Sequence, residues 1–459
     1  MAVVLRDDRI DLSVLSRVLA RPRHACALRT LRRDQYVKER NAILLTPTLP
    51  RWRALLTMFC LILAGEVIFS LPFHITRFFR PTALAGFGLG NAALGDIFAV
   101  YGVTAMLAYF PGGALADRFS TRILISGSLL ATAAGGLYFS TLPGARGMAW
   151  LYGYWGLTTI LLFWAALIRA TREWGGPLTQ GRAFGLLEGG RGLVAAGLAS
   201  FAVALLTFTP ATGTDPSALT SAAALVRLIY FYTAITATAG VLCAFAIPAS
   251  SHERTVTHAG FALDLVREPT LWLQALIVVA AYCGYKSLDY FSLYAHDMLG
   301  MNEVAAARFS ATTGYLRPLC ALAAGWLADR TRASTITLTL FAIGAASYGV
   351  LPRNPLQTLL YVNVLVTIAV IYSLRGIYFA LLQESAVPKH FTGTAVGFIS
   401  VLGYTPDVFF APIAGRLLDQ APGVIGYRHL FELLLVIFVI GGSAVIALRH
   451  LIARRQHLK

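Results

Sequence analysis

Long apolar stretches alternate with short polar connections along almost the whole chain. Each stretch holds about 20 residues, the length that an α-helix needs to cross the hydrocarbon core of a bilayer. The twelve stretches are 54–74, 93–114, 122–142, 147–170, 184–208, 221–247, 271–294, 304–328, 335–352, 356–382, 393–417 and 429–449. The pattern predicts an all-α polytopic membrane protein with twelve transmembrane helices.

The composition favours lipid over water as the solvent of this chain. Of the 459 residues, 57% are hydrophobic and 13% are charged, whereas a soluble globular protein has about 25% charged residues. The net charge of +16 argues against nucleic-acid binding, because the basic side chains cluster around the apolar stretches instead of forming one patch. By the positive-inside rule, this distribution places both termini in the cytoplasm. We expect an integral, multi-pass protein of a bacterial inner membrane.

A charged sequence occurs twice, each time directly after an apolar stretch. The copies are GALADRFSTR at 113–122 and GWLADRTRAS at 325–334, so that Asp117 and Asp329 stand 212 residues apart. Gly185 and Gly397 repeat this offset, which predicts a duplicated six-helix unit, a construction common among secondary transporters. The predicted segments are a basic cytoplasmic extension at 1–50, a six-helix bundle at 51–248, a cytoplasmic linker at 249–270, a second six-helix bundle at 271–450 and a basic cytoplasmic tail at 451–459.

The repeated segment resembles a loop signature of the major facilitator superfamily, G-x-L-A-D-R-x-G-R-R. Gly113 to Arg118 match its first part, and Gly325 to Arg330 match it again after the eighth stretch. The resemblance covers roughly 51–450 and implies two pseudo-symmetric six-helix bundles that rock to give alternating access. Both copies depart at the late glycine, which is Ser120 in one and Arg332 in the other, and the second copy lacks the final basic pair.

The resemblance further implies a gate at the cytoplasmic ends of the helices. The glycines would let two helices approach closely, the aspartates would cap or face helix N-termini, and the arginines would pair with carboxylates across the loop. These contacts would hold the state that is closed to the cytoplasm. The alternative is that the charges only anchor the loops. The predicted gating residues are Gly113, Asp117, Arg118, Arg122, Gly325, Asp329 and Arg330.

Several cationic and tyrosine side chains fall inside the apolar stretches, where a charge is costly unless it lines a cavity or has a partner. In the seventh stretch Tyr282, Lys286, Asp289 and Tyr290 share one helical face. A cation framed by tyrosines suits an anionic group, although a structural ion pair would give the same pattern. The predicted substrate-binding residues are Lys286, Arg317, Arg375, Arg191, Tyr282, Tyr285, Tyr290 and Tyr378.

Four acidic residues inside the stretches are candidates for proton coupling. Glu66 and Asp289 are the first choices, because a carboxylate in apolar surroundings can take up a proton. Pairing between helices is the alternative role. His74 and Arg77, further along the first stretch, are expected at the outer interface. The predicted proton-coupling residues are Glu66, Asp289, Glu188 and Asp407.

Together these features predict a secondary active transporter that moves a small polar solute, an organic anion, together with protons. Amino acids or short peptides, drug efflux and a solute sensor that does not transport remain alternatives. The sequence contains no phosphate-binding loop, metal-ligand spacing or nucleophile–base set, so neither an enzyme nor a cofactor is expected. The expected partners are the solute, protons and the bilayer, with no nucleic acid, and the chain is expected to act as a monomer.

Overall fold

The computed structural model describes residues 50–176, 180–208, 222–248, 268–351, 357–384 and 392–457, and all its regular elements there are helices. The chain divides into the units Met1–Ala54 and Leu55–Lys459. Nearly all of the predicted extension at 1–50 and most of the linker at 249–270 lie outside the described residues. The tail is described as far as His457.

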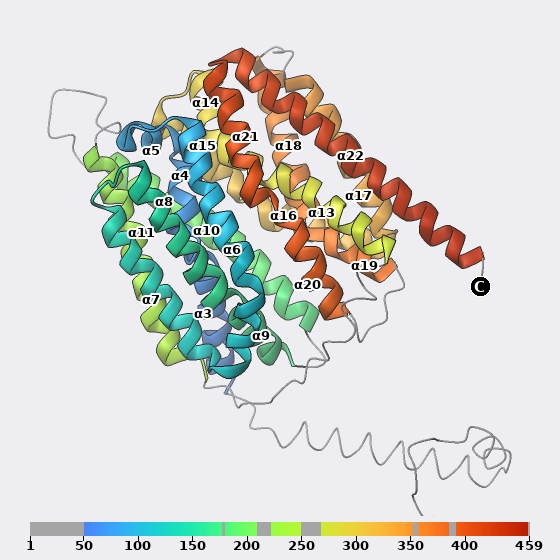
Figure 1. Cartoon of the computed structure of the whole chain (residues 1–459), viewed down its shortest axis with the longest axis horizontal. Coiled ribbons are helices and arrows are strands. Elements are labelled where there is room, and N and C mark those ends of the chain that lie inside the picture. Colours follow the sequence, from blue (N-terminus) through green and yellow to red (C-terminus); the bar gives the residue numbers. More distant parts are fainter. Residues whose placement is uncertain are drawn as a thin grey trace, which may run out of the picture. The chain divides into compact units, whose positions relative to one another are not determined.

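The first half of the chain supplies the helices that Figure 1 colours from blue to green. They are α3 (Arg51–Val67), η1 (Ser70–His74), α4 (Ile75–Phe78), α5 (Arg80–Phe87), α6 (Asn91–Arg118), α7 (Thr121–Phe139), α8 (Ala145–Gly156), η2 (Leu157–Trp164), α9 (Ala165–Gly175), α10 (Gln180–Phe208) and α11 (Ala222–Ala246). Within this half α7 packs against α11 and α6 against α8.

The second half supplies the helices that run from yellow to red (Figure 1). They are α13 (Pro269–Ser287), η4 (Leu288–Tyr290), α14 (Phe291–Leu299), α15 (Glu303–Gly314), α16 (Leu316–Arg330), α17 (Ala333–Val350), α18 (Gln357–Ile377), η6 (Tyr378–Ala380), α19 (Leu381–Glu384), α20 (Thr392–Gly403), α21 (Pro406–Gln420) and α22 (Val424–His457). Here α22 packs against α13 and α17, and α16 against α18.

Helices occupy all twelve predicted positions, but not all of them are uninterrupted spans. In the described part of the chain, ten helices are long and apolar enough to cross a membrane. An eleventh span results if α3 and the segment Ser70–Phe78, which comprises η1 and α4, count as one span. The two are bent by 41° at a short break. The number of candidate spans is therefore ten or eleven, and the predicted eighth span is the one that does not qualify.

The eighth position is divided between α15 and α16 at Tyr315. Pro318 lies in the first turn of α16 and has no backbone N–H to donate to the carbonyl of Gly314, with which its ring also collides. The helix therefore ends at Gly314 and restarts after Tyr315. Arg308 and Arg317 add charge to the two short helices, and the two do not qualify as a membrane span.

The two halves contact each other mainly where α6 packs against α21 and where α10 packs against α15 and α16. Small residues permit the first contact. A Cβ atom on Gly102 of α6 would lie 2.5 Å from the carbonyl oxygen of Asp407 in α21. Gly95 and Gly415 meet backbone atoms of the facing helix in the same way. Backbones this close leave no room for a side chain, so glycine at these positions sets the distance between the halves.

Candidate functional site: a charged cavity between the two halves

The two ends of the helical bundle differ in the contacts between the halves. We call the end where α6 finishes at Arg118 and α16 finishes at Arg330 the motif end, because both copies of the repeated segment lie there. At the opposite end the halves are joined by polar contacts. Asp419 of α21 accepts hydrogen bonds from the backbone N–H groups of Asn91 and Ala92, at 3.1 and 2.7 Å. A carboxylate from one half therefore caps the first turn of α6 in the other half.

Two further contacts cross the opposite end. Arg416 forms an ion pair with Asp96 at 2.9 Å, and Thr82 donates a hydrogen bond to Glu303 at 2.5 Å. The opposite end is thus closed by side chains of both halves.

The predicted gating residues at the motif end have a different environment. Asp117 and Asp329 lie in the last turns of α6 and α16 and are exposed. A Cβ atom on Gly113 or Gly325 would meet nothing within 4 Å. The close helix approach expected from the glycines is therefore absent from this conformation.

The remaining gating residues differ in exposure. Arg118 and Arg330 are exposed and Arg122 is partly buried, and the guanidinium of Arg330 stacks 3.8 Å from the ring centre of Trp326. The cap that α17 receives comes from Glu384, which accepts a hydrogen bond from the backbone of Ser334 at 3.0 Å. The capping role predicted for Asp117 and Asp329 stays a prediction.

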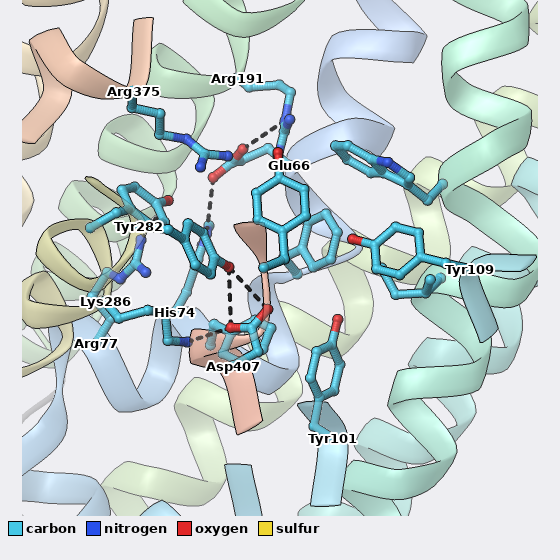
Figure 2. Close-up of a pocket in the computed structure, with 16 residues that line it drawn as sticks. Glu66, His74, Arg77, Tyr101, Tyr109, Arg191, Tyr282, Lys286, Arg375 and Asp407 are labelled. Atoms are coloured by element: carbon cyan, nitrogen blue, oxygen red, sulfur yellow. Dashed lines mark hydrogen bonds and ion pairs between the residues drawn. The ribbon is translucent and has the colours of Figure 1, made fainter. Parts of the chain in front are cut away.

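A cavity of about 90 Å³ lies between the halves, lined by side chains from both (Figure 2). Aromatic rings form much of its wall. The charged lining residues come from α3, η1, α4 and α10 on one side and from α13, α18 and α21 on the other. The lining side chains that carry or can carry a charge are Glu66, His74, Arg77, Arg191, Lys286, Arg375 and Asp407.

Glu66 is the centre of the first charged cluster and is only 4% exposed. Its carboxylate contacts Nε2 of His74 at 3.2 Å, Nε of Arg191 at 3.1 Å and Nη1 of Arg317 at 3.5 Å. Arg191 and Arg317 both also contact Glu188, at 2.6 and 3.2 Å. Two carboxylates and two guanidinium groups thus connect α3, α10 and α16, and Arg317 joins them from the other half of the chain.

Lys286 is the centre of the second cluster and is 3% exposed. Its ammonium lies 3.3 Å from Asp289 and 3.2 Å from Asp407. The Tyr282 hydroxyl donates to Asp407 at 3.1 Å, a contact that Figure 2 shows with dashed lines. Arg77 of the first half also belongs to this cluster, because its Nε lies 2.5 Å from Asp289.

Arg375 of α18 differs from the other cations of the cavity. Its Nε and Nη1 atoms are buried and have no hydrogen-bond partner. Its guanidinium stacks 4.2 Å from the ring centre of Tyr285, whose hydroxyl accepts a hydrogen bond from Arg77 at 2.9 Å. Among the described residues no carboxylate forms an ion pair with Arg375.

The structure brings together most, but not all, of the residues predicted for the site. Glu188, Asp289 and Arg317 do not line the cavity but form ion pairs with residues that do. Tyr290 and Tyr378 are buried and do not line the cavity. The hydroxyl of Tyr290 donates to the Ala411 carbonyl, and that of Tyr378 is bonded to Tyr404.

Two residues that the sequence placed at the outer interface belong to the site instead. His74 and Arg77 line the cavity and are bonded to Glu66 and Asp289. The repeat offset of 212 residues could have identified His74 as a site residue, because it makes His74 the equivalent of Lys286, which was predicted to bind substrate. The aromatic lining was also missed, and the residues that form it are Phe69, Phe73, Tyr101, Tyr109, Trp164 and Tyr404.

Comparisons with known proteins agree with this architecture. Residues 54–406 match the family model of the Major Facilitator Superfamily. The chain is 28% identical over 397 residues to the inner membrane protein YqcE of Escherichia coli (strain K12), covering 83% of this chain and 91% of that protein. It is 26% identical over 400 residues to the inner membrane protein YihN of the same organism, covering 84% and 92%.

Solved structures show the same fold at low sequence identity. The nucleoside transporter NupG is similar with a TM-score of 0.66 and 10% identity, over 86% of this chain and 98% of NupG. A bacterial homologue of the human lysosomal transporter Spinster, in an inward-facing and occupied conformation, is similar with a TM-score of 0.65 and 14% identity, over 89% and 98%.

The chain belongs to the major facilitator superfamily, since the family model spans more than half of its length. It is a multi-pass integral membrane protein and a secondary transporter, not an enzyme. The fold class predicted from the repeated segment and the apolar stretches is confirmed.

Proposed function

We propose that this transporter moves a small organic anion by alternating access. Arg375 carries the proposal, because it is a permanently charged side chain in the cavity wall whose buried nitrogens lack partners. A buried guanidinium without hydrogen bonds is costly. A bound carboxylate or phosphate would supply the missing acceptors and the missing charge.

The acidic residues of the cavity give little support to a cationic or zwitterionic substrate. Glu66 and Asp407 both line the cavity, but Glu66 already contacts two guanidinium groups and Asp407 contacts the Lys286 ammonium. An incoming ammonium would have to displace one of these cations. Amino acids, short peptides and lipophilic drugs are therefore secondary candidates.

Among the four candidate acids, Asp407 is the best placed to carry a coupling proton. Its side chain is 17% exposed towards the cavity, compared with 5% for Glu66 and 4% for Asp289. Its one cationic partner among the described residues, Lys286, is shared with Asp289, so a proton on Asp407 would leave Lys286 with a partner. Glu188 is 45% exposed and contacts two arginines, which favours its charged form.

We further propose a topology in which the motif end faces the cytoplasm and both termini lie there, as the positive-inside rule predicts. The bundles at 51–248 and 271–450 would be joined by the linker at 249–270. Apolar cores that lie mostly within one half support this division. One core runs from Leu271 to Leu448 and another from Cys60 to Ile247, and a third runs from Leu71 to Tyr232 and includes only Ala307, Ala311 and Ala411 of the second half. The protein would act as a monomer in a bacterial inner membrane.

Thermal unfolding of the purified full-length protein tests the substrate class. The panel contains organic carboxylates, phosphate esters, amino acids, dipeptides, neutral sugars and lipophilic cations. A ligand at 100 times its dissociation constant stabilises by about 2.7 kcal/mol. We expect a shift with one class of anion, lost in Arg375→Gln and kept in Arg308→Gln, which removes an exposed arginine of α15. A shift with lipophilic cations alone would refute the proposal.

Uptake into vesicles separates a transporter of that anion from a sensor. The stabilising anion is supplied outside proteoliposomes with and without a pH gradient. Uptake that increases with an inward proton gradient supports proton coupling. Binding without any uptake would support the sensor instead.

A further inference from the structure

The two clusters and the cavity wall contain an unequal number of positive and negative side chains. Among the described residues there, the carboxylates are Glu66, Glu188, Asp289 and Asp407, and the cations are Arg77, Arg191, Lys286, Arg317 and Arg375. His74 is counted as neutral, with Nε2 bonded to Glu66 and Nδ1 to Ser70. Every carboxylate has at least one cation within ion-pair distance, and Arg375 is the cation that remains.

Arg80 is a further buried cation but does not enter the count. It does not line the cavity, and its Nε donates to Asn91 at the start of α6, among the contacts of the opposite end. Its guanidinium stacks 4.2 Å from the ring centre of Tyr290. Its Nη1 and Nη2 atoms are buried without hydrogen-bond partners, and in the described part of the chain no ion pair connects it to either cluster.

One uncompensated charge matters because alternating access passes through states in which the site is shielded from water. The free energy of a buried net charge is several kcal/mol higher than that of a balanced site. The occupant that removes this cost supplies one negative charge and no more. A second negative charge would leave the same imbalance with the opposite sign.

We propose that the substrate and the protons it brings carry one negative charge in total into this site. This deepens the proposed function and rests on its anion site. An anion with one charge then binds alone. An anion with two charges binds with one proton, and Asp407 receives that proton because a neutral Asp407 restores the balance.

The surroundings of Asp407 are compatible with both protonation states. Lys286 and Tyr282 contact it from α13, and Tyr101 and Tyr109 of α6 line the same cavity. When Asp407 is charged, the Tyr282 hydroxyl donates to it. When Asp407 is protonated, its O–H can donate to a substrate oxygen, and Lys286 keeps its contact with Asp289.

Calorimetric titration of the full-length protein tests the charge rule. The probes are succinate and monomethyl succinate, which share a carbon skeleton and differ by one charge at neutral pH. Each is titrated in buffers of different ionisation enthalpy, which gives the number of protons taken up on binding. We expect no proton uptake with monomethyl succinate and one proton with succinate. Equal proton uptake for both probes would overturn the charge rule.

The variant Asp407→Asn is the sharper measurement, because it removes one carboxylate and leaves two cations uncompensated. Succinate should then bind without taking up a proton, and its affinity should lose its dependence on pH. Continued uptake of one proton by this variant would also overturn the rule. Binding of neither probe to the unmodified protein, with no shift from any anion of the panel, would instead refute the anion site itself.

Discussion

Arg77 and Asp289 form a buried ion pair between residues that are 212 positions apart, the same offset that separates the two copies of the repeated segment. The backbone N–H of Arg80 and the hydroxyl of Ser292 repeat this relationship at 3.3 Å. Residues at equivalent positions of the two repeats can touch only where the axis relating the repeats passes between them. The axis of the duplicated fold therefore runs beside the second charged cluster.

Loss of the Asp289 carboxylate should destabilise the fold strongly. In Asp289→Asn, Arg77 loses its carboxylate partner and Lys286 keeps only Asp407. Removing one member of a buried ion pair costs about 3–5 kcal/mol. The free energy of unfolding in detergent measures this loss. The exposed pair of Asp96 and Arg416 is the control, and Asp96→Asn should cost less than about 1 kcal/mol.

A double replacement of the same two residues gives a second measurement. Arg77→Gln combined with Asp289→Asn should recover part of the stability that Asp289→Asn loses, because it also removes the guanidinium left without its carboxylate partner. A double variant no more stable than Asp289→Asn would show that the other contacts of Arg77, such as its hydrogen bond to Tyr285, are sufficient for it.

Removal of the Arg375 charge should affect stability and binding in opposite directions. Arg375→Gln takes away a buried charged group that lacks partners, so the ligand-free protein should become more stable, by about 1 kcal/mol or more. The stabilisation by anions should disappear at the same time. Unfolding curves with and without anion measure both quantities. A ligand-free variant less stable than the parent would mean that Arg375 has a structural role.

The glycines between α6 and α21 should control which end of the transporter opens. In Gly102→Ala the new Cβ would lie 2.5 Å from the Asp407 carbonyl oxygen, so the helices must separate at that level. We expect single cysteines near Asn91 to become more reactive towards a water-soluble maleimide. Gly113→Ala is the matched control, because its Cβ meets nothing within 4 Å. Equal labelling of both variants would contradict the prediction.

The cap that Asp419 places on α6 should stabilise the closed opposite end. Asp419→Ala removes the acceptor for two backbone N–H groups of α6, a loss of about 1 kcal/mol for a helix cap. The population open at this end should rise about fivefold, because 1 kcal/mol corresponds to that factor. Cross-linking of cysteine pairs placed in α5 and α14 measures the population. Unchanged cross-linking would show that Asp419 caps the helix without holding the gate.

The gating role of the repeated segment remains a prediction, tested by Asp117→Asn. Asp117 is exposed in the present conformation, so the free energy of unfolding of the variant should differ from that of the parent protein by less than about 0.5 kcal/mol. If Asp117 acts only when the motif end closes, the transport rate should fall while the affinity for the anion stays constant. An unchanged rate would leave Asp117 with the role of a topology marker.

The sequence predicted where the helices lie and which charged residues belong to the candidate site. It did not predict which of these residues contact one another across the two halves. Apolar length and the repeat determine where helices lie, and the cost of charge in a bilayer identifies Glu66, Lys286 and Arg375 as site residues. The contact of Glu66 with Arg317 depends on the packing of α10 against α16 of the other half, which no local pattern encodes. His74 and Arg77 were wrongly predicted at the outer interface because they lie near the end of the first apolar stretch. The repeat offset, which makes them equivalent to Lys286 and Asp289, was not applied to them.

The break at Tyr315 has a practical consequence for any experiment that reads membrane orientation. A hydropathy scan that misses the divided eighth span counts an odd number of crossings and inverts every later segment. It would then place the C-terminus outside the cell and predict the wrong signal from a fluorescent or phosphatase reporter fused after His457. A reporter at that position, paired with one in the connection that precedes α15, therefore shows directly whether two short helices joined at a kink complete one passage through the bilayer.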